Sequence, residues 1–457
     1  MGAAPRGEGR EAAQTRRETA ADRREWAAMC RHVRVPTMWG IPLRLFLAAL
    51  ALGLLLPLAD RVLAPLTAYP PLDAGAVGSL LGIISGAMVT LAGLVFSALT
   101  AAMSLGVTAL SVRISPVFQG DRVIQWGLGC FVGAFAYALL IALSIAVGGQ
   151  AYRPWASTIV AVIITTGCGI MFIAVVVRVC RLLNPGGLLR RLAAEGREAS
   201  RYDPARFHTR AAELATGTAA GGDAVRRRRR TPRGDVVLAV NIPRLLDCED
   251  AWGMRIELVP SLGTPVPVGG LLFRTSAPAS RAQCRTLESV LAFGDVLSPA
   301  SGPFGAIRAM VDIALKALSP AVNDPSRAVQ ALDEIEDILA ELAPDIAARE
   351  ALLAAHPDAS VLRDWTRSWD DYVAAATDEI RQYGTGSVQI QRRLRALFDT
   401  LAAQCEPGQR GALAERRAVL DRGLERWWAD PLDRRLAGCA DPQGLGRAAG
   451  TAEAPPA

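Results

Sequence analysis

The chain has 457 residues, of which 51% are hydrophobic and 21% are charged, and its formal net charge is +6. The hydrophobic residues concentrate in residues 41–177, where charges almost vanish, and this pattern excludes a purely soluble protein, a disordered tail protein and a disulfide scaffold. Residues 178–234 carry +9 (14 basic, 5 acidic), whereas residues 235–457 carry −8 (23 basic, 31 acidic). A basic segment beside a membrane suits anionic lipid headgroups, so the basic balance gives little support for nucleic acid, and no nucleic-acid partner is expected.

Four apolar stretches predict a transmembrane domain over residues 41–180, after a basic N-terminal tail at 1–40. The spans are expected at about 41–59, 77–110, 124–147 and 156–178, because crossing a bilayer takes about 20 apolar residues. Arginines gather in the tail, in the loop between the second and third spans, and after the fourth span. The positive-inside rule then predicts a multi-pass protein of the inner membrane with both termini in the cytoplasm.

The second span is unusually long. The uncharged stretch 74–112 makes a helix of about 58 Å at 1.5 Å per residue, against a hydrocarbon core of about 30 Å. Because no proline interrupts it, we expect this helix to project beyond the membrane. A break at Gly106 is the alternative.

One side of the second span carries small and hydroxyl side chains. On a helical wheel at about 100° per residue they share an arc of roughly 80°. The stripe consists of Gly82, Gly86, Thr90, Gly93, Ser97, Thr100, Ser104 and Thr108. Such a stripe is typical either of a path lined by hydroxyls between several copies of the chain or of a helix-packing seam. The glycines at 82 and 86 form a GxxxG motif, which favours close helix packing, and Gly129 and Gly133 repeat the motif in the third span. No Asp, Glu, Lys or His is expected inside a span, which disfavours a proton relay.

Residues 181–234 are predicted to form a basic juxtamembrane helix and an arginine-rich linker. The run Arg226, Arg227, Arg228, Arg229 and Arg230 is either a solvated linker or a contact for lipid headgroups. Few aromatic residues interleave with it, so a base-stacking platform is absent.

Residues 235–275 predict a small β-containing subdomain, with strands at 235–240, 254–259 and 268–273 and a short helix at 243–247. The turn glycines are similar to those of barrel-sandwich carrier domains. Lys316, the only lysine, lies outside this region, so the carrier interpretation fails. No cofactor, metal site or catalytic residue is proposed, because Cys and His do not cluster and no nucleotide-binding or hydrolase motif is present.

Residues 276–440 predict a helical cytoplasmic domain, followed by a flexible tail at 441–457. Helices are expected at 280–293, 303–318, 325–341, 345–355, 361–383, 386–403 and 409–429. The turn at 319–325 offers Asn323 and Asp324 either as ligands of a cation or small molecule, or as a capped turn in which Pro325 starts the next helix. We expect Arg392, Arg393 and Arg395 to lie on a solvated helix face.

Several stretches resemble a family of bacterial predicted membrane proteins, domain of unknown function 2254. They are GAMVTLAGLVFSALTAAMSLGVTALSVRISP, FGAIRAMVDIALKALSPAVNDPSRAVQALDEI, DEIRQYG and the closing DPQGLG. The segment SPASGP before Phe304 departs from the more acidic run that is usual there. The resemblance implies an inner-membrane protein with an N-terminal membrane domain and a cytoplasmic C-terminal domain, and it implies no activity.

The sequence therefore predicts a mainly α membrane protein with four transmembrane helices, followed by a cytoplasmic α+β domain made of a small β segment and a helical bundle. The leading functional hypothesis is a homo-oligomeric channel-like protein, with the second span lining a path and the cytoplasmic domain gating it. The alternative is a membrane-anchored sensor or scaffold without transport activity. An enzyme acting on a lipid-linked substrate has no candidate nucleophile.

Overall fold

The computed structural model describes residues 26–28, 30, 38–63, 73–109, 111–114, 118–148, 154–200, 223–228, 234–355 and 367–445. The chain forms two compact units. We call residues 36–108 and 114–188 the membrane unit, and residues 1–35, 109–113 and 189–457 the head unit.

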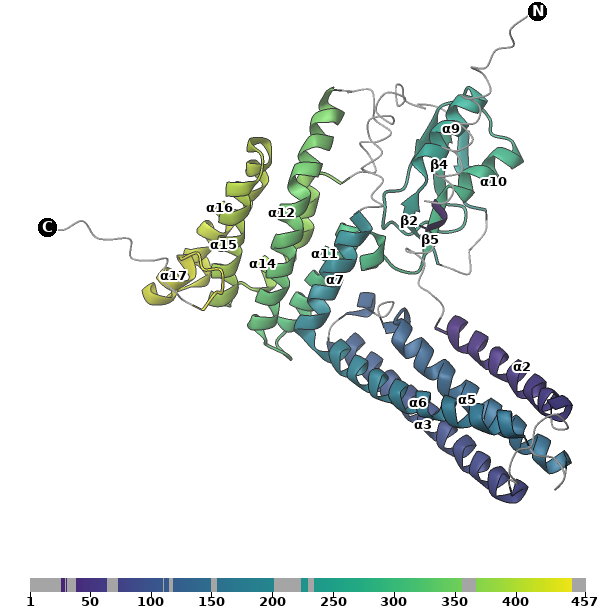
Figure 1. The fold of residues 1–457 in the computed structure, drawn as a ribbon. Helices are drawn as coiled ribbons and strands as arrows, with labels where there is room; N and C mark the ends of the chain where they lie inside the picture. The colour runs from purple at the N-terminus through teal and green to yellow at the C-terminus, as the bar shows by residue number, and fades with distance from the viewer. Residues whose placement is uncertain are drawn as a thin grey trace, which may run out of the picture. The chain divides into compact units, whose positions relative to one another are not determined.

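The membrane unit is a bundle of four apolar helices (Figure 1). They are α2 (Gly40–Leu63), α3 (Ala74–Ala109), α5 (Arg122–Gly148) and α6 (Trp155–Leu183). All four are long and apolar enough to cross a membrane, which confirms the predicted fold class. Helix α3 continues through Gly106, so the alternative of a break there is wrong. Its 36 residues span about 54 Å, well beyond the hydrocarbon core of about 30 Å.

Helix α5 is the most buried of the four helices and packs closely on α2. A Cβ atom at Gly129 would lie 2.6 Å from Cδ1 of Leu45 and 2.9 Å from Cα of Pro42, and one at Gly133 would lie 3.3 Å from Cβ of Ala49. The GxxxG motif of the third span is therefore a packing seam within the chain, because only glycine lets the two backbones approach this closely.

Two buried carboxylates cap helices of the membrane unit. Asp60, near the end of α2, accepts hydrogen bonds from the N–H groups of Ala156 and Ser157 at 3.1 Å and from Oγ of Ser157 at 2.6 Å. Asp121 accepts from the N–H of Val123 and forms an ion pair with Arg178 at 2.7 Å. The prediction that no acid lies inside a span is thus wrong at Asp60, because α2 runs four residues beyond the predicted span.

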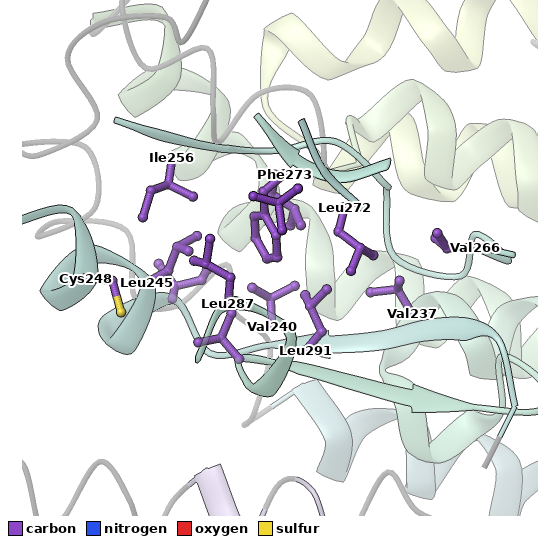
Figure 2. Packing of buried hydrophobic residues seen from close by; sticks show 14 of the residues in the cluster. Val237, Val240, Leu245, Cys248, Ile256, Val266, Leu272, Phe273, Leu287 and Leu291 are labelled. Atoms are coloured by element: carbon purple, nitrogen blue, oxygen red, sulfur yellow. The ribbon is translucent and has the colours of Figure 1, made fainter. Parts of the chain in front are cut away.

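The β part of the head unit contains two antiparallel sheets. One has the order β1 (Asp223–Arg226), β4 (Leu271–Thr275), β3 (Ile256–Leu258), and the other pairs β2 (Val236–Val240) with β5 (Leu291–Gly294). Figure 2 shows the apolar core between these strands and helices α9 (Ile242–Trp252) and α10 (Arg281–Ser289), with Phe273 and Leu287 fully buried. The three predicted strands and the short helix are confirmed. Strand β5 was expected to be helical, and β1 was not predicted.

The remainder of the head unit is helical (Figure 1). Helix α7 (Pro185–Ser200) precedes the β part, and η4 (Pro299–Ser301) and α11 (Pro303–Ala317) follow it. Then come α12 (Pro325–Ala355), α14 (Trp369–Tyr383), α15 (Val388–Gln404), η5 (Pro407–Gln409), α16 (Arg410–Trp427) and α17 (Pro431–Gly438). The two helices predicted at 325–341 and 345–355 form the single helix α12, which continues through Pro344, and α17 was not predicted.

The arginines of α15 are buried, so the prediction of a solvated face is wrong. Arg393 forms ion pairs with Asp333 at 2.7 Å and Glu336 at 2.6 Å, both on α12. Arg395 pairs with Asp421 of α16 and donates to the carbonyl of Ala437, and Arg392 donates to the carbonyl of Leu436. These guanidinium groups therefore hold α12, α16 and α17 against α15, because buried charges need partners.

Glu249 makes the stability of the β part dependent on pH. Burial raises the pKa of this carboxyl, and the hydrogen bond from the N–H of Ile256 opposes the rise only in part. Because the pKa is higher in the folded than in the unfolded chain, this contribution to stability is present at acidic pH and is lost as the pH rises through the raised pKa. We expect Glu249→Gln, which keeps the acceptor for Ile256, to flatten the dependence of the melting temperature on pH as the pH rises above the ordinary range of a glutamate carboxyl, about 4.

The matched control is Glu257→Gln on β3, where the partly buried carboxylate lies 3.8 Å from the exposed guanidinium of Arg274. Melting curves of the full chain in detergent at several pH values measure the effect. An unchanged slope in Glu249→Gln would contradict the assignment to Glu249.

Candidate functional site on helix α3

The small and hydroxyl residues of α3 occupy a face that the chain's own bundle leaves uncovered. Gly82, Gly86, Thr90, Gly93, Ser97, Thr100 and Ser104 are all exposed, and the side chain of Thr108 lies outside the described ones. A Cβ atom added at any of the three glycines would meet no atom of the described chain within 4 Å. Gly75 and Ser79 extend the stripe, so every α3 residue on this arc of roughly 80° is Gly, Ser or Thr.

The opposite face of α3 packs into the bundle. Val77 and Leu81 join the cluster around Tyr137, while Met88 and Val95 join the cluster around Phe131. On the helical wheel this buried face lies about 160° from the stripe. The packed face of α3 therefore carries large apolar residues, while the stripe lies opposite it and is flanked by exposed apolar side chains such as Ile83 and Leu94.

The GxxxG motif at Gly82 and Gly86 and the one at Gly129 and Gly133 differ in what they contact. Gly129 and Gly133 lie against α2, whereas Gly82 and Gly86 have open space beside them. An unused small-residue face in lipid allows a second helix to approach closely. The stripe is thus suited to a contact with, or a path beside, a helix from another molecule.

The hydroxyl groups on the stripe are partly satisfied by their own helix. Thr90 donates to the carbonyl of Gly86 and Thr100 to that of Phe96, each at 2.9 Å. A hydroxyl that donates in this way keeps acceptor lone pairs. The stripe can therefore offer weak oxygen ligands to water or a cation, but no titratable group.

The residues that follow α3 belong to the head unit and bind α11. Ser111 precedes the short helix η2 (Val112–Ile114), and Arg113 lies within it. Both side chains donate to Oδ2 of Asp312 at 2.9 Å, Ser111 from its Oγ and Arg113 from its Nε. Sequence reasoning missed Asp312. The available signal was that it is the only acid on α11, and that Arg113 is the first charge after the long uncharged stretch.

The arginine run is divided by the fold. Arg227 is buried, with an ion pair to Asp235 at 2.9 Å and its guanidinium carbon 4.4 Å from the ring centre of Phe293. The guanidinium of Arg226 is exposed and donates to the carbonyl of Gly269, and Arg228 is also exposed. Arg229 and Arg230 lie outside the described residues. Among the described residues of the run, only Arg226 and Arg228 are thus exposed, because the side chain of Arg227 is committed to the interior.

The turn at 319–325 is built as a helix cap. Asp324 accepts from the N–H of Arg327 at 3.1 Å and forms an ion pair with its guanidinium at 3.3 Å. Asn323 has a φ of 47°, a left-handed conformation that asparagine tolerates, and Pro325 is the first residue of α12. These contacts favour the cap over the ligand site. Within the described residues, no three His, Cys, Asp or Glu side chains come together as metal ligands.

Comparison with known proteins places the chain in a family. The model of the family described as "Predicted membrane protein (DUF2254)" matches residues 36–400. The chain is 31% identical over 220 residues to uncharacterized protein Mb1321c of Mycobacterium bovis, and equally to uncharacterized protein Rv1290c of Mycobacterium tuberculosis. The matched region is 45% of this chain and 40% of each relative, so the chain covers about two fifths of their length. No solved structure matches.

Proposed function

The chain belongs to the DUF2254 family of predicted membrane proteins, and from this premise we propose that it is an oligomeric, channel-like protein in which copies of α3 face one another around a path. The observation that carries the proposal is the stripe of glycine, serine and threonine on the face of α3 that lies opposite its packing face. Small and hydroxyl side chains gain little from contact with lipid alone. Hydroxyl oxygens that line a path, in contrast, replace part of the hydration shell of a permeating solute.

The orientation of the proposed path rests on two arguments. The described residues at 26–28, 30, 109, 111–113 and after 188 are separated by spans, yet they belong to one compact unit, and Cys30 packs with Leu238, Ala292 and Leu297. Membership of one compact unit supports placing these segments on the same side of the membrane. The arginines of the tail, of the loop between α3 and α5 and of the segment after α6 support the cytoplasm of a cell inner membrane as that side, by the positive-inside rule. Arg226 and Arg228 are then available for anionic lipid headgroups.

A membrane-anchored sensor or scaffold is the second candidate. The observation that favours it is that Thr90 and Thr100 already donate to their own helix. A stripe that only packs against another α3 would leave these donors satisfied without water.

The test is ion flux into liposomes that carry the full chain. We expect Ser97→Leu and Ser104→Leu to reduce flux to that of empty liposomes, because leucine narrows and dries the proposed path. The matched control is Ala98→Leu, which adds the same side chain at an exposed position about 100° from Ser97 on the same helix. Native mass spectrometry of each variant measures the oligomeric state.

The outcomes separate the two candidates. Flux that both stripe variants abolish and the control keeps, with oligomers intact, supports the path. Oligomers that carry no flux under varied voltage, salt and osmotic tension support the scaffold. A monomer, or equal loss of flux in Ala98→Leu, contradicts the proposal that copies of α3 line a path.

A further inference from the structure

Asp312 collects donors from the segment that directly follows α3. Ser111 is buried. Its Oγ donates a hydrogen bond to the carboxylate of Asp312 and accepts one from the N–H of Arg113 at 3.1 Å. Arg113 adds its Nε bond to the same carboxylate oxygen, and its Nη1 donates to the carbonyl of Leu297 at 3.2 Å. The segment 111–113 is therefore held through the side chains of Ser111 and Arg113, by the carboxylate of Asp312 and by the carbonyl of Leu297.

The carboxylate of Asp312 is itself fixed in the helical part of the head unit. Helix α11 buries Met310, Val311 and Ile313 on either side of it in sequence. Arg308, one turn earlier, lies 3.9 Å from Asp312 and pairs with Glu379 of α14 at 2.6 Å. A displacement of α11 thus acts directly on the carboxylate that holds Ser111 and Arg113, and a displacement of α14 reaches it through Arg308.

The connection between this anchor and α3 is short in sequence. Only Leu110 separates Ala109, the last residue of α3, from Ser111. Near its end α3 is packed as well, because a Cβ atom at Gly106 would lie 3.3 Å from the ring of Phe118 and 3.6 Å from Cδ1 of Ile114. The anchor at Ser111 and Arg113 is therefore separated from the last residue of α3 by a single residue of chain.

We propose that Asp312 is a coupling residue, through which rearrangement of the head-unit helices pulls on α3 and thereby regulates the path. This inference rests on the proposed function for its effect on flux, and on the contacts of Asp312 for the coupling itself. Charge-assisted hydrogen bonds to one carboxylate suit this role, because they are either formed or broken when the carboxylate moves. Apolar contacts would instead shift gradually.

Hydrogen exchange of the full chain in nanodiscs tests the coupling without any assay of flux. In Asp312→Asn and in Arg113→Gln, the amides of residues 111–114 are expected to exchange roughly ten-fold faster, the factor that the loss of one charge-assisted hydrogen bond gives. The charge-swapped double variant Arg113→Asp with Asp312→Arg is expected to restore protection. The matched control is Asp399→Asn, which breaks the ion pair between Asp399 on α15 and Arg417 on α16. It is expected to leave the exchange rates of the amides at 111–114 unchanged.

Liposome flux of the same variants is then compared with exchange. Flux that changes in both single variants and returns in the double variant supports the coupling. Unchanged exchange at 111–114 overturns it, and so does faster exchange with unaltered flux in a chain that conducts. If the wild-type chain carries no flux, the proposed function fails, and the exchange result on its own decides whether Asp312 holds the end of α3.

Discussion

Asp421→Ala is expected to lower the free energy of unfolding by about 1.5–3 kcal/mol, because it removes the counter-charge of the buried guanidinium of Arg395, although the carboxylate itself is half exposed. Arg395 is fully buried on α15, and its other contact is the carbonyl of Ala437 at 3.0 Å. Losing the carboxylate therefore leaves one neutral acceptor for a full charge in the interior.

The double variant Asp421→Ala with Arg395→Met distinguishes this cause from simple loss of packing. Methionine removes the buried charge and fills most of the volume, so we expect the double variant to recover most of the lost stability. Pulse proteolysis of the full chain along a urea series measures both. A loss below about 1 kcal/mol in Asp421→Ala would mean that the pair behaves as a solvated surface ion pair.

Gly305→Ala is expected to destabilise the start of α11 by about 1–3 kcal/mol, the usual effect of overpacking. The added Cβ atom would lie 2.1 Å from the carbonyl oxygen of Ser298 and 2.9 Å from its carbonyl carbon. Both neighbours are backbone atoms, so relief requires a shift of the segment before α11 rather than a new side-chain rotamer.

Gly411→Ala is the matched control for this substitution. Gly411 lies in the first turn of α16, where a Cβ atom would meet no atom of the described chain within 4 Å. Alanine there is expected to raise stability by up to about 1 kcal/mol through helix propensity. Thermal unfolding of both variants checks the opposite signs, and an equal response would contradict the steric argument at Gly305.

The local features of this chain were predictable because each depends on residues close together in sequence. Four runs of apolar residues predict the spans, since lipid demands about 20 apolar residues in succession. The strands at 236–240, 256–258 and 271–275 follow from their β-branched and aromatic content, and the cap at Asp324 follows from its position before Pro325.

Other elements depend on partners distant in sequence. Leu291–Gly294 reads as the end of a helix, yet it becomes β5 because it pairs with β2, where Leu291 lies opposite Val240. The arginines of α15 look like a solvated face, yet acids and carbonyls from α12, α16 and α17 enclose them. A sequence pattern cannot distinguish a charge that faces water from one that faces a partner in another helix.

The candidate site illustrates the same division. The residues of the α3 stripe and their common face follow from the 3.6-residue helical period, which is a local property of the sequence. Whether that face turns toward the chain's own bundle depends on how α3 packs with α5 and α6, and so does the contrast between its glycines and those of α5. Asp312 joins Ser111 and Arg113 across about 200 residues of chain. Such long-range contacts arise only when the folded helices bring the two segments together.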